Sequence, residues 1–113
     1  MKINSYHFGE MDIDGTLYTS DLVIASGSVH TRWYRQEGHA VRVSDLEKWI
    51  SKDCKRLIVG TGAAGFCKVL PELEIYCKER SIKFIALPTA KAIDEFNAIS
   101  DKPNVVAAFH LTC

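Results

Sequence analysis

The feature that most constrains the fold is a short apolar run from Leu57 to Val59. It leads into a loop that carries three glycines, Gly60, Gly62 and Gly65. A run of this length that is rich in β-branched residues is typical of a buried strand. The glycines allow the backbone to turn and to approach another group closely. The stretch therefore predicts a central strand of an α/β sheet, with a loop at the end where such sheets bind ligands.

The second half of the chain alternates helical patterns with two further apolar runs. Pro71 suits the first position of a helix, and apolar residues at helical spacing mark its buried side: Leu73, Tyr76 and Cys77. Strands are expected at residues 83–87 and 105–109, with a turn over residues 101–104. Thr89 is expected to cap a third helix, whose buried side is formed by Ala92, Ile93, Phe96 and Ile99.

The first half predicts β structure and one short helix. Asp14-Gly15 is a strong two-residue hairpin signal between strands at residues 11–13 and 16–18. Further strands are expected at residues 21–25 and 28–34, and a capping box at residues 44–47 starts a short helix. We therefore predict a single α/β domain over residues 1–113, with a largely buried central sheet, helices packed on it and an N-terminal β-hairpin region.

Charge and composition limit the partners. Fourteen lysines and arginines balance fourteen aspartates and glutamates, so we expect no binding to nucleic acid or to an anionic membrane. No apolar stretch reaches the length of a membrane span or of a signal-peptide core, which predicts a cytoplasmic protein. The four cysteines form no C-x-x-C pair, so neither a zinc ribbon nor a thioredoxin-type redox motif is indicated. We expect reduced thiols, no metal site and no cofactor.

Two short motifs suggest chemistry that their context does not support. Residues 60–65 match the dinucleotide fingerprint G-x-G-x-x-G, but Pro71 starts a new helix and the next strand ends at Leu87 without a following acidic residue. Asp12-Ile13-Asp14-Gly15 is similar to the first motif of haloacid dehalogenase-type phosphatases. In that family the aspartate ends a fully buried strand, whereas Asp12 follows a polar segment, and the chain is short for that fold. The hairpin explains this motif without catalysis.

The glycine loop and the start of the third helix together predict a small-ligand pocket. Glycines expose backbone N–H groups, and a helix start adds partial positive charge beside them. The residues expected to line this pocket are Gly60, Thr61, Gly62, Gly65, Phe66 and Thr89. In the alternative interpretation, the glycines only let the chain turn, and the protein's own side chains fill the space. The sequence assigns no catalytic residue.

Trp33-Tyr34 predicts a contact with another molecule. Consecutive residues of a strand face opposite sides, so the two rings do not enter the same core and one covers a partner or a second layer. We expect self-association through one of them. His39, His110 and Cys113 receive no role, because two potential ligands at the end of the chain are too few for a metal site.

The order of motifs along the chain resembles a family of small uncharacterised α/β domains that includes the adipogenesis-associated domain protein and mitochondrial complex I assembly factor 3. The matching segments are Tyr6-His7-Phe8-Gly9, Ile13-Asp14-Gly15, Tyr18-Thr19-Ser20-Asp21-Leu22, Trp33 with Gly38-His39, Leu57 to Gly62, Pro88-Thr89-Ala90, Phe96-Asn97 and His110-Leu111-Thr112-Cys113. Members of the family often carry two adjacent tryptophans, where this chain has Trp33-Tyr34.

The resemblance implies a three-layer fold with a mixed sheet, and for the mitochondrial relatives a role in protein assembly. It implies no established catalytic activity. The leading expectation is a non-catalytic protein-interaction or assembly-type domain that associates with itself and with other proteins. The alternative, from a different class, is a small-molecule or anion-binding enzyme with its site at the loop of residues 60–65.

Overall fold

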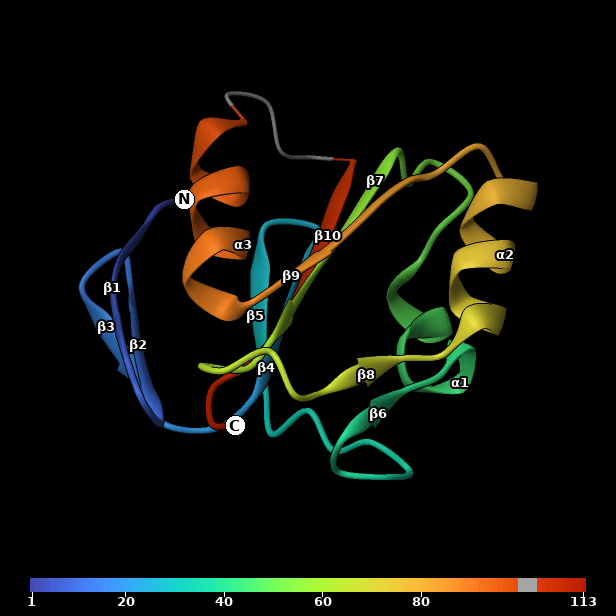
Figure 1. Cartoon of the computed structure of the whole chain (residues 1–113). Helices are drawn as coiled ribbons and strands as arrows, with labels where there is room; N and C mark the ends of the chain where they lie inside the picture. Colours follow the sequence, from blue (N-terminus) through green and yellow to red (C-terminus); the bar gives the residue numbers. More distant parts are fainter. Residues whose placement is uncertain (100–103) are drawn as a thin grey trace.

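The computed structural model of the chain describes residues 1–99 and 104–113 (Figure 1). In chain order its elements are β1 (Ile3–His7), β2 (Glu10–Ile13), β3 (Thr16–Tyr18), β4 (Leu22–Ala25), β5 (Ser28–Thr31), β6 (Ala40–Val41), α1 (Val43–Leu46), the 3-10 helix η1 (Glu47–Trp49), β7 (Arg56–Thr61), β8 (Lys68–Val69), α2 (Pro71–Glu79), β9 (Lys83–Leu87), α3 (Thr89–Ala98) and β10 (Val105–His110).

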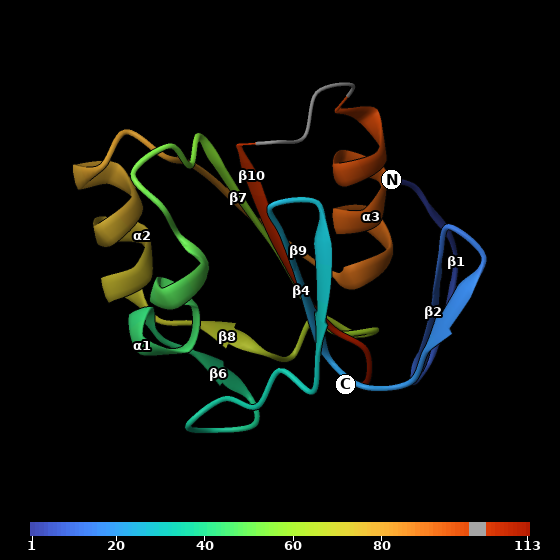
Figure 2. The ribbon, with the colours of Figure 1, turned by 180° about the vertical axis from the view of Figure 1, so that it is seen from behind.

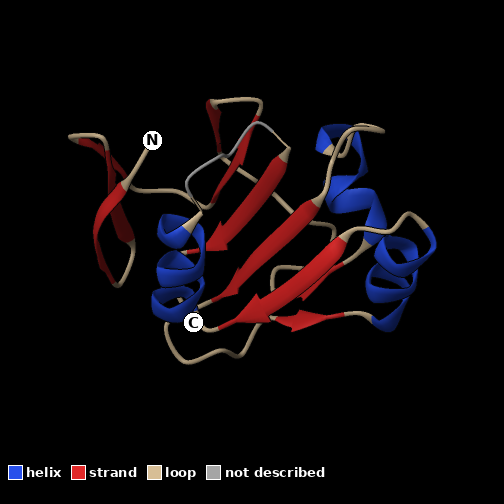
Figure 3. Ribbon diagram, turned by 90° about the horizontal axis from the view of Figure 1, so that it is seen from above, coloured by secondary structure: helices blue, strands red, loops and turns tan. Residues whose placement is uncertain are grey.

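The central sheet has the strand order β5-β4-β10-β7-β9 (Figure 3). Strands β10, β7 and β9 run parallel, whereas β4 and β5 are antiparallel to their neighbours, so the sheet is mixed as predicted. Strand β10 lies at the centre of this sheet, and all six of its residues are buried. The reason is that other elements cover both faces of the sheet. The predicted strands at 57–59, 83–87 and 105–109 are confirmed.

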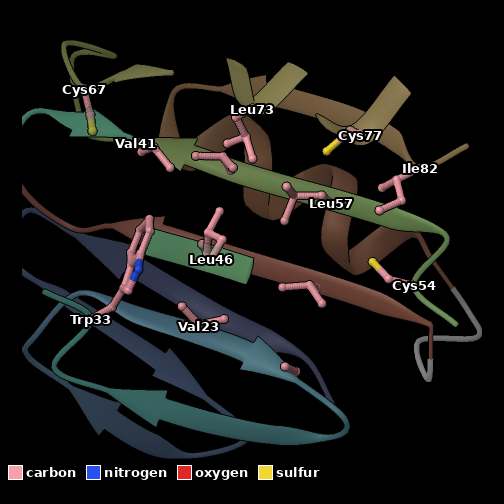
Figure 4. Packing of buried hydrophobic residues seen from close by; sticks show 14 residues of the cluster. Val23, Trp33, Val41, Leu46, Cys54, Leu57, Cys67, Leu73, Cys77 and Ile82 are labelled. Atoms are coloured by element: carbon pink, nitrogen blue, oxygen red, sulfur yellow. The ribbon is translucent and has the colours of Figure 1, made fainter. Parts of the chain in front are cut away.

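Two apolar cores lie on opposite faces of this sheet. Along β7, Leu57 and Val59 point into one core and Ile58 into the other, since successive side chains of a strand alternate between faces. Helices α1 and α2 cover the first face, and α3 with the three-stranded sheet β1-β2-β3 covers the second (Figures 1 and 2). Figure 4 shows the first core, where Leu73 and Cys77 of α2 pack onto the sheet.

The N-terminal hairpin has the predicted register, with Ile13 opposite Thr16. Asp14 and Gly15 both have positive φ values, 52° and 89°, as a tight two-residue turn requires. The carboxylate of Asp12 accepts the N–H of Gly15 at 2.9 Å, which accounts for the aspartate of the phosphatase-like motif by turn geometry. Strand β1, which the sequence analysis did not predict, pairs with β2 and widens the hairpin into a sheet.

Several predicted boundaries are wrong. Helix α1 begins at Val43, one residue before the predicted cap at Ser44, because the Asp45 carboxylate accepts the N–H of Arg42 at 2.8 Å and fixes that start. Strand β5 ends at Thr31, three residues short of Tyr34. Most of the predicted turn at 101–104 lies outside the described residues. Helix α2 does begin at Pro71, as predicted. Among the described helices, none is long and apolar enough to cross a membrane.

Candidate functional site

The glycine loop follows β7 at the carboxyl end of the parallel strands and is tied to the rest of the protein by its own backbone. Its hydrogen bonds run from the N–H of Gly62 to Thr89 Oγ1 (2.9 Å), of Ala63 to the Thr112 carbonyl (2.7 Å), of Gly65 to the Gly62 carbonyl (3.2 Å) and of Cys67 to the Thr61 carbonyl (3.0 Å). These amides are the groups that an anion at the loop would need. In this conformation they are already paired within the protein.

Thr89 is the first residue of α3 and not its N-cap, which is Pro88, so the predicted capping role is wrong. The Thr89 hydroxyl instead accepts the N–H of Gly62 and donates to the His110 carbonyl at 2.7 Å. The side chain is fully buried. This hydroxyl thus connects the glycine loop, the start of α3 and the end of β10. Because both of its hydrogen bonds go to these segments, it does not cap the helix.

The other residues expected to line a ligand pocket gather at the same end of the sheet. Gly60 lies within β7, where an added Cβ would be 2.7 Å from the Phe109 ring. Thr61 is buried at the end of β7, whereas Phe66 is 67% exposed beside the loop. The structure therefore brings the predicted residues together, with the backbone packed closely and Phe66 directed toward solvent.

A buried charged cluster lies beside this loop and consists of Asp21, Arg35 and His110. Asp21 Oδ2 is 2.9 Å from Arg35 Nη1 and 2.7 Å from His110 Nδ1, and Asp21 Oδ1 accepts the N–H of Leu111 at 2.7 Å. The Arg35 side chain is only 4% exposed and that of His110 only 7%. We call these three residues the Asp21 cluster. It holds the end of β10 against the loops that precede β4 and follow β5.

The protonation of the Asp21 cluster follows from its contacts. Burial by itself would raise the pKa of the Asp21 carboxyl, but hydrogen bonds from His110, the Leu111 N–H and Arg35 outweigh it, so the pKa is lowered from 3.8. Asp21 is therefore a carboxylate at neutral pH. Because a carboxylate only accepts hydrogen bonds, a hydrogen bond from His110 to Asp21 requires the proton on Nδ1, an atom that also lies 3.1 Å from Arg35 Nη2. His110 Nε2 then faces Thr112 Oγ1 at 3.5 Å.

Arg35 has further partners besides Asp21. Its guanidinium lies 4.6 Å from the ring centroid of Trp33, and its Nη2 donates to the Gly38 carbonyl at 2.6 Å. Trp33 is itself buried and donates its ring N–H to the Asp45 carbonyl at 2.9 Å. Of the predicted interface pair, only Tyr34 presents its ring to solvent, at 81% exposure. The side chain of Trp33 belongs to the core.

The remaining polar groups near the Asp21 cluster have structural partners. The Tyr6 hydroxyl donates to the Leu111 carbonyl at 2.8 Å, and burial raises the pKa of Tyr6. The ring of His39, which is exposed, packs edge-on to His110 with 6.0 Å between ring centroids. Burial also raises the pKa of the Cys67 thiol, so its reactive thiolate form is disfavoured. The described residues contain no group of three or more acidic, histidine or cysteine side chains that could hold a metal ion.

Three exposed aromatic rings belong to loops at this end of the molecule. Tyr34 lies between Trp33 and Arg35, which contact Asp21, and Phe8 precedes Gly9, whose N–H donates to the Leu111 carbonyl. Phe66 precedes Cys67, which is bonded to Thr61. Phe8, Tyr34 and Phe66 are 65%, 81% and 67% exposed, more than the other large apolar side chains of the described residues. In Figure 1 their loops lie at the end of the molecule where the C-terminus is marked.

The sequence analysis missed the Asp21 cluster. Two of its members lay in segments that carried the family resemblance, Tyr18 to Leu22 and His110 to Cys113. A signal was therefore present in each segment, but 89 residues separate Asp21 from His110 and nothing in the sequence paired them. Arg35 had no such signal, since it lies in a polar loop.

Comparison with known proteins places the chain among relatives of the same fold. The family described as "Protein of unknown function (DUF498/DUF598)" matches residues 3–110. The chain belongs to this family. It is 30% identical to the conserved hypothetical protein PH1505 from Pyrococcus horikoshii OT3, over 100% of both chains and with a TM-score of 0.85.

Two further solved structures resemble this DUF498/DUF598 chain. The protein named MT938 is 28% identical, covers 99% of this chain and 98% of its own, and has a TM-score of 0.78. A Bordetella pertussis protein described as a Mth938-like domain has a TM-score of 0.73 at 16% identity, over 97% of this chain and 85% of its own. The last resemblance shows the fold alone. None of these descriptions states an activity, so a function has to be argued from the site.

Proposed function

We propose that this DUF498/DUF598 chain is a non-catalytic protein-interaction domain of the assembly type, located in the cytoplasm, that associates with itself and with other proteins. The observation that carries the proposal is the exposure of three rings, Phe8, Tyr34 and Phe66, on loops at one end of the molecule. Exposed aromatic side chains are characteristic of protein interfaces, because each ring removes a large apolar area from water when a partner covers it.

The scaffold beneath these rings supports an interaction role. The Asp21 cluster and the hydroxyl of Thr89 fix the loops that present the rings, so little conformational entropy is lost when a partner binds. The paired charges of the cluster are used inside the protein and are not offered to a substrate. The resemblance to the adipogenesis-associated domain protein and to complex I assembly factor 3 agrees with such a role and is part of this proposal.

Self-association is tested at Tyr34. We expect Tyr34→Ala to weaken self-association about tenfold, because an exposed tyrosine that becomes buried at an interface is a typical energetic anchor. Sedimentation equilibrium of the unmodified protein and of the variant measures the change. Ile75→Ala is the matched control, since Ile75 is an exposed apolar residue of α2 at 57% exposure. A protein that stays monomeric at about tens of micromolar, or an equal effect of both variants, would contradict the proposal.

The alternative proposal is that the chain is a small-molecule or anion-binding enzyme with its site at the glycine loop of residues 60–65. The exposed ring of Phe66 beside this loop favours it, because such a ring offers an apolar contact without disturbing the paired amides. If a ligand found by screening binds there, Phe66→Ala should weaken its binding about tenfold and leave the thermal stability unchanged. Isothermal titration calorimetry gives the affinity. An affinity that does not depend on Phe66 rules out this location.

A further inference from the structure

A cavity of about 360 Å³ lies at the opposite end of β7 from the glycine loop. It is lined by Ile50, Ser51, Lys52, Cys54, Tyr76, Arg80 and Ile82. These residues come from the segment between η1 and β7 and from the C-terminal end of α2 with the turn after it. A volume of this size falls in the range of small-ligand pockets.

The floor of the cavity is apolar. Cys54 and Ile82 are 5% and 6% exposed and belong to the first core, with Ile50 packed against them. Figure 4 shows Cys54, Cys77 and Ile82 together at one end of this core. The Cys54 thiol donates to the Arg56 carbonyl at 3.3 Å, so its hydrogen-bonding capacity is used within the protein. Because Cys54 and Ile82 are almost wholly buried, the apolar surface open to a ligand comes mainly from Ile50 and Tyr76, which are half-buried.

The rim of the cavity carries two cations, Lys52 and Arg80. Within residues 1–99 and 104–113, neither forms an ion pair with a carboxylate. Arg80 is nevertheless held in place, since its guanidinium lies 3.6 Å from the ring centroid of Tyr76 and its Nη1 donates to the Tyr76 carbonyl at 3.3 Å. A fixed guanidinium loses less entropy when it binds an oxyanion, and its planar donors match a carboxylate or a phosphate.

We infer that this cavity binds a small ligand made of one anionic group, a carboxylate or a phosphate monoester, on an apolar body. The anionic group lies between Lys52 and Arg80, and the apolar body contacts the floor formed by Ile50, Cys54 and Ile82. The inference is independent of the proposed function, because β7 separates this cavity from the exposed rings by about six residues, or roughly 20 Å.

A second cavity provides an internal comparison. It measures about 310 Å³ and lies between β1 and α3, with Lys2 and Asp94 among its lining residues. The carboxylate of Asp94 offsets the charge of Lys2, so the lining of the second cavity has no excess of positive charge. The two cavities are therefore similar in size but differ in charge. A ligand that only seeks apolar surface would enter both cavities. An amphiphilic anion should prefer the first.

The test is a titration of the isotopically labelled protein with octanoate, octyl phosphate, octanol and inorganic phosphate, followed by amide chemical shifts. We expect octanoate or octyl phosphate to shift the amides of Ile50, Ser51 and Ile82 in a saturable way, and the tighter of the two identifies the anionic group. Octanol and inorganic phosphate should bind at least about fivefold more weakly, because each offers only half of the interactions.

Variants distinguish binding through the charged contacts from nonspecific hydrophobic binding. Lys52→Gln and Arg80→Gln should each weaken binding of the better ligand about threefold to fivefold, while Lys91→Gln, an exposed lysine of α3, should leave it unchanged. Amide spectra without ligand show that the variants fold. The inference is overturned if octanol binds as tightly as octanoate, if shifts appear equally around Ala90 and Asn97 of the second cavity, or if no saturable shift appears below about 10 mM.

Discussion

Replacing Gly62 by alanine is expected to lower the free energy of unfolding by about 3 kcal/mol. Two costs combine at this position. Gly62 has φ = 103°, a backbone conformation that residues with a Cβ rarely adopt. An added Cβ would also lie 2.7 Å from the Thr112 carbonyl oxygen and 2.9 Å from that of Cys113. Because these are backbone atoms, the end of the chain would have to move away from the loop.

Gly27→Ala is the matched control for the Gly62 variant. Gly27 also has a positive φ, 73°, but nothing lies within 4 Å of its added Cβ. The control therefore carries only the conformational cost, about 1 kcal/mol. Urea unfolding of both variants measures the difference. Equal losses would show that the C-terminal residues do not pack on the glycine loop in solution, and would favour the ligand-pocket alternative over a closed loop.

The second large effect is expected at Asp21, where Asp21→Asn should cost about 3 kcal/mol at neutral pH. Asparagine keeps the shape of the side chain and an oxygen that can accept the Leu111 N–H. It removes the negative charge between Arg35 and His110, and leaves the guanidinium, which is 4% exposed, without its counter-ion. A buried charge that loses its partner retains its full desolvation cost, which makes the effect large.

Glu37→Gln is the control for the charge at Asp21. Glu37 also pairs with an arginine, Arg42, but its side chain is 61% exposed. Water screens an exposed pair, so this variant should cost less than about 1 kcal/mol. Chemical denaturation at pH 7 compares the two. If Asp21→Asn costs no more than Glu37→Gln, the Asp21 cluster does not hold the end of β10.

The pH dependence of stability follows from the same carboxylate. The pKa of Asp21 in the folded protein lies below its ordinary value of 3.8, so the folded state binds this proton more weakly than the unfolded state. The stabilisation is therefore fully present above about pH 4 and is lost as the pH falls through the folded pKa. In an acid titration followed by urea unfolding, the unmodified protein should lose this contribution, and Asp21→Asn should lack that part of the pH dependence.

Local sequence determined most of the secondary structure. Short apolar runs placed β7, β9 and β10, and Pro71 set the start of α2 because its ring suits the first helical turn. Asp14-Gly15 fixed the hairpin register, since only residues that tolerate positive φ can form that turn. The family resemblance added the mixed sheet and the layer order, which local patterns do not specify.

Tertiary structure decided the uses of individual polar residues. The position of Thr89 before an apolar helical pattern predicted a helix cap. Its hydroxyl instead forms hydrogen bonds with the Gly62 N–H and the His110 carbonyl, which are 27 and 21 residues away in the sequence. The sequence predicted that either Trp33 or Tyr34 could lie at an interface. The loop after β5 places the Trp33 side chain in the core and leaves the Tyr34 side chain exposed. The Asp21 cluster has the largest separation, 89 residues between Asp21 and His110. Propensity and periodicity act over a few neighbouring residues, so only the packed chain could bring these groups into contact.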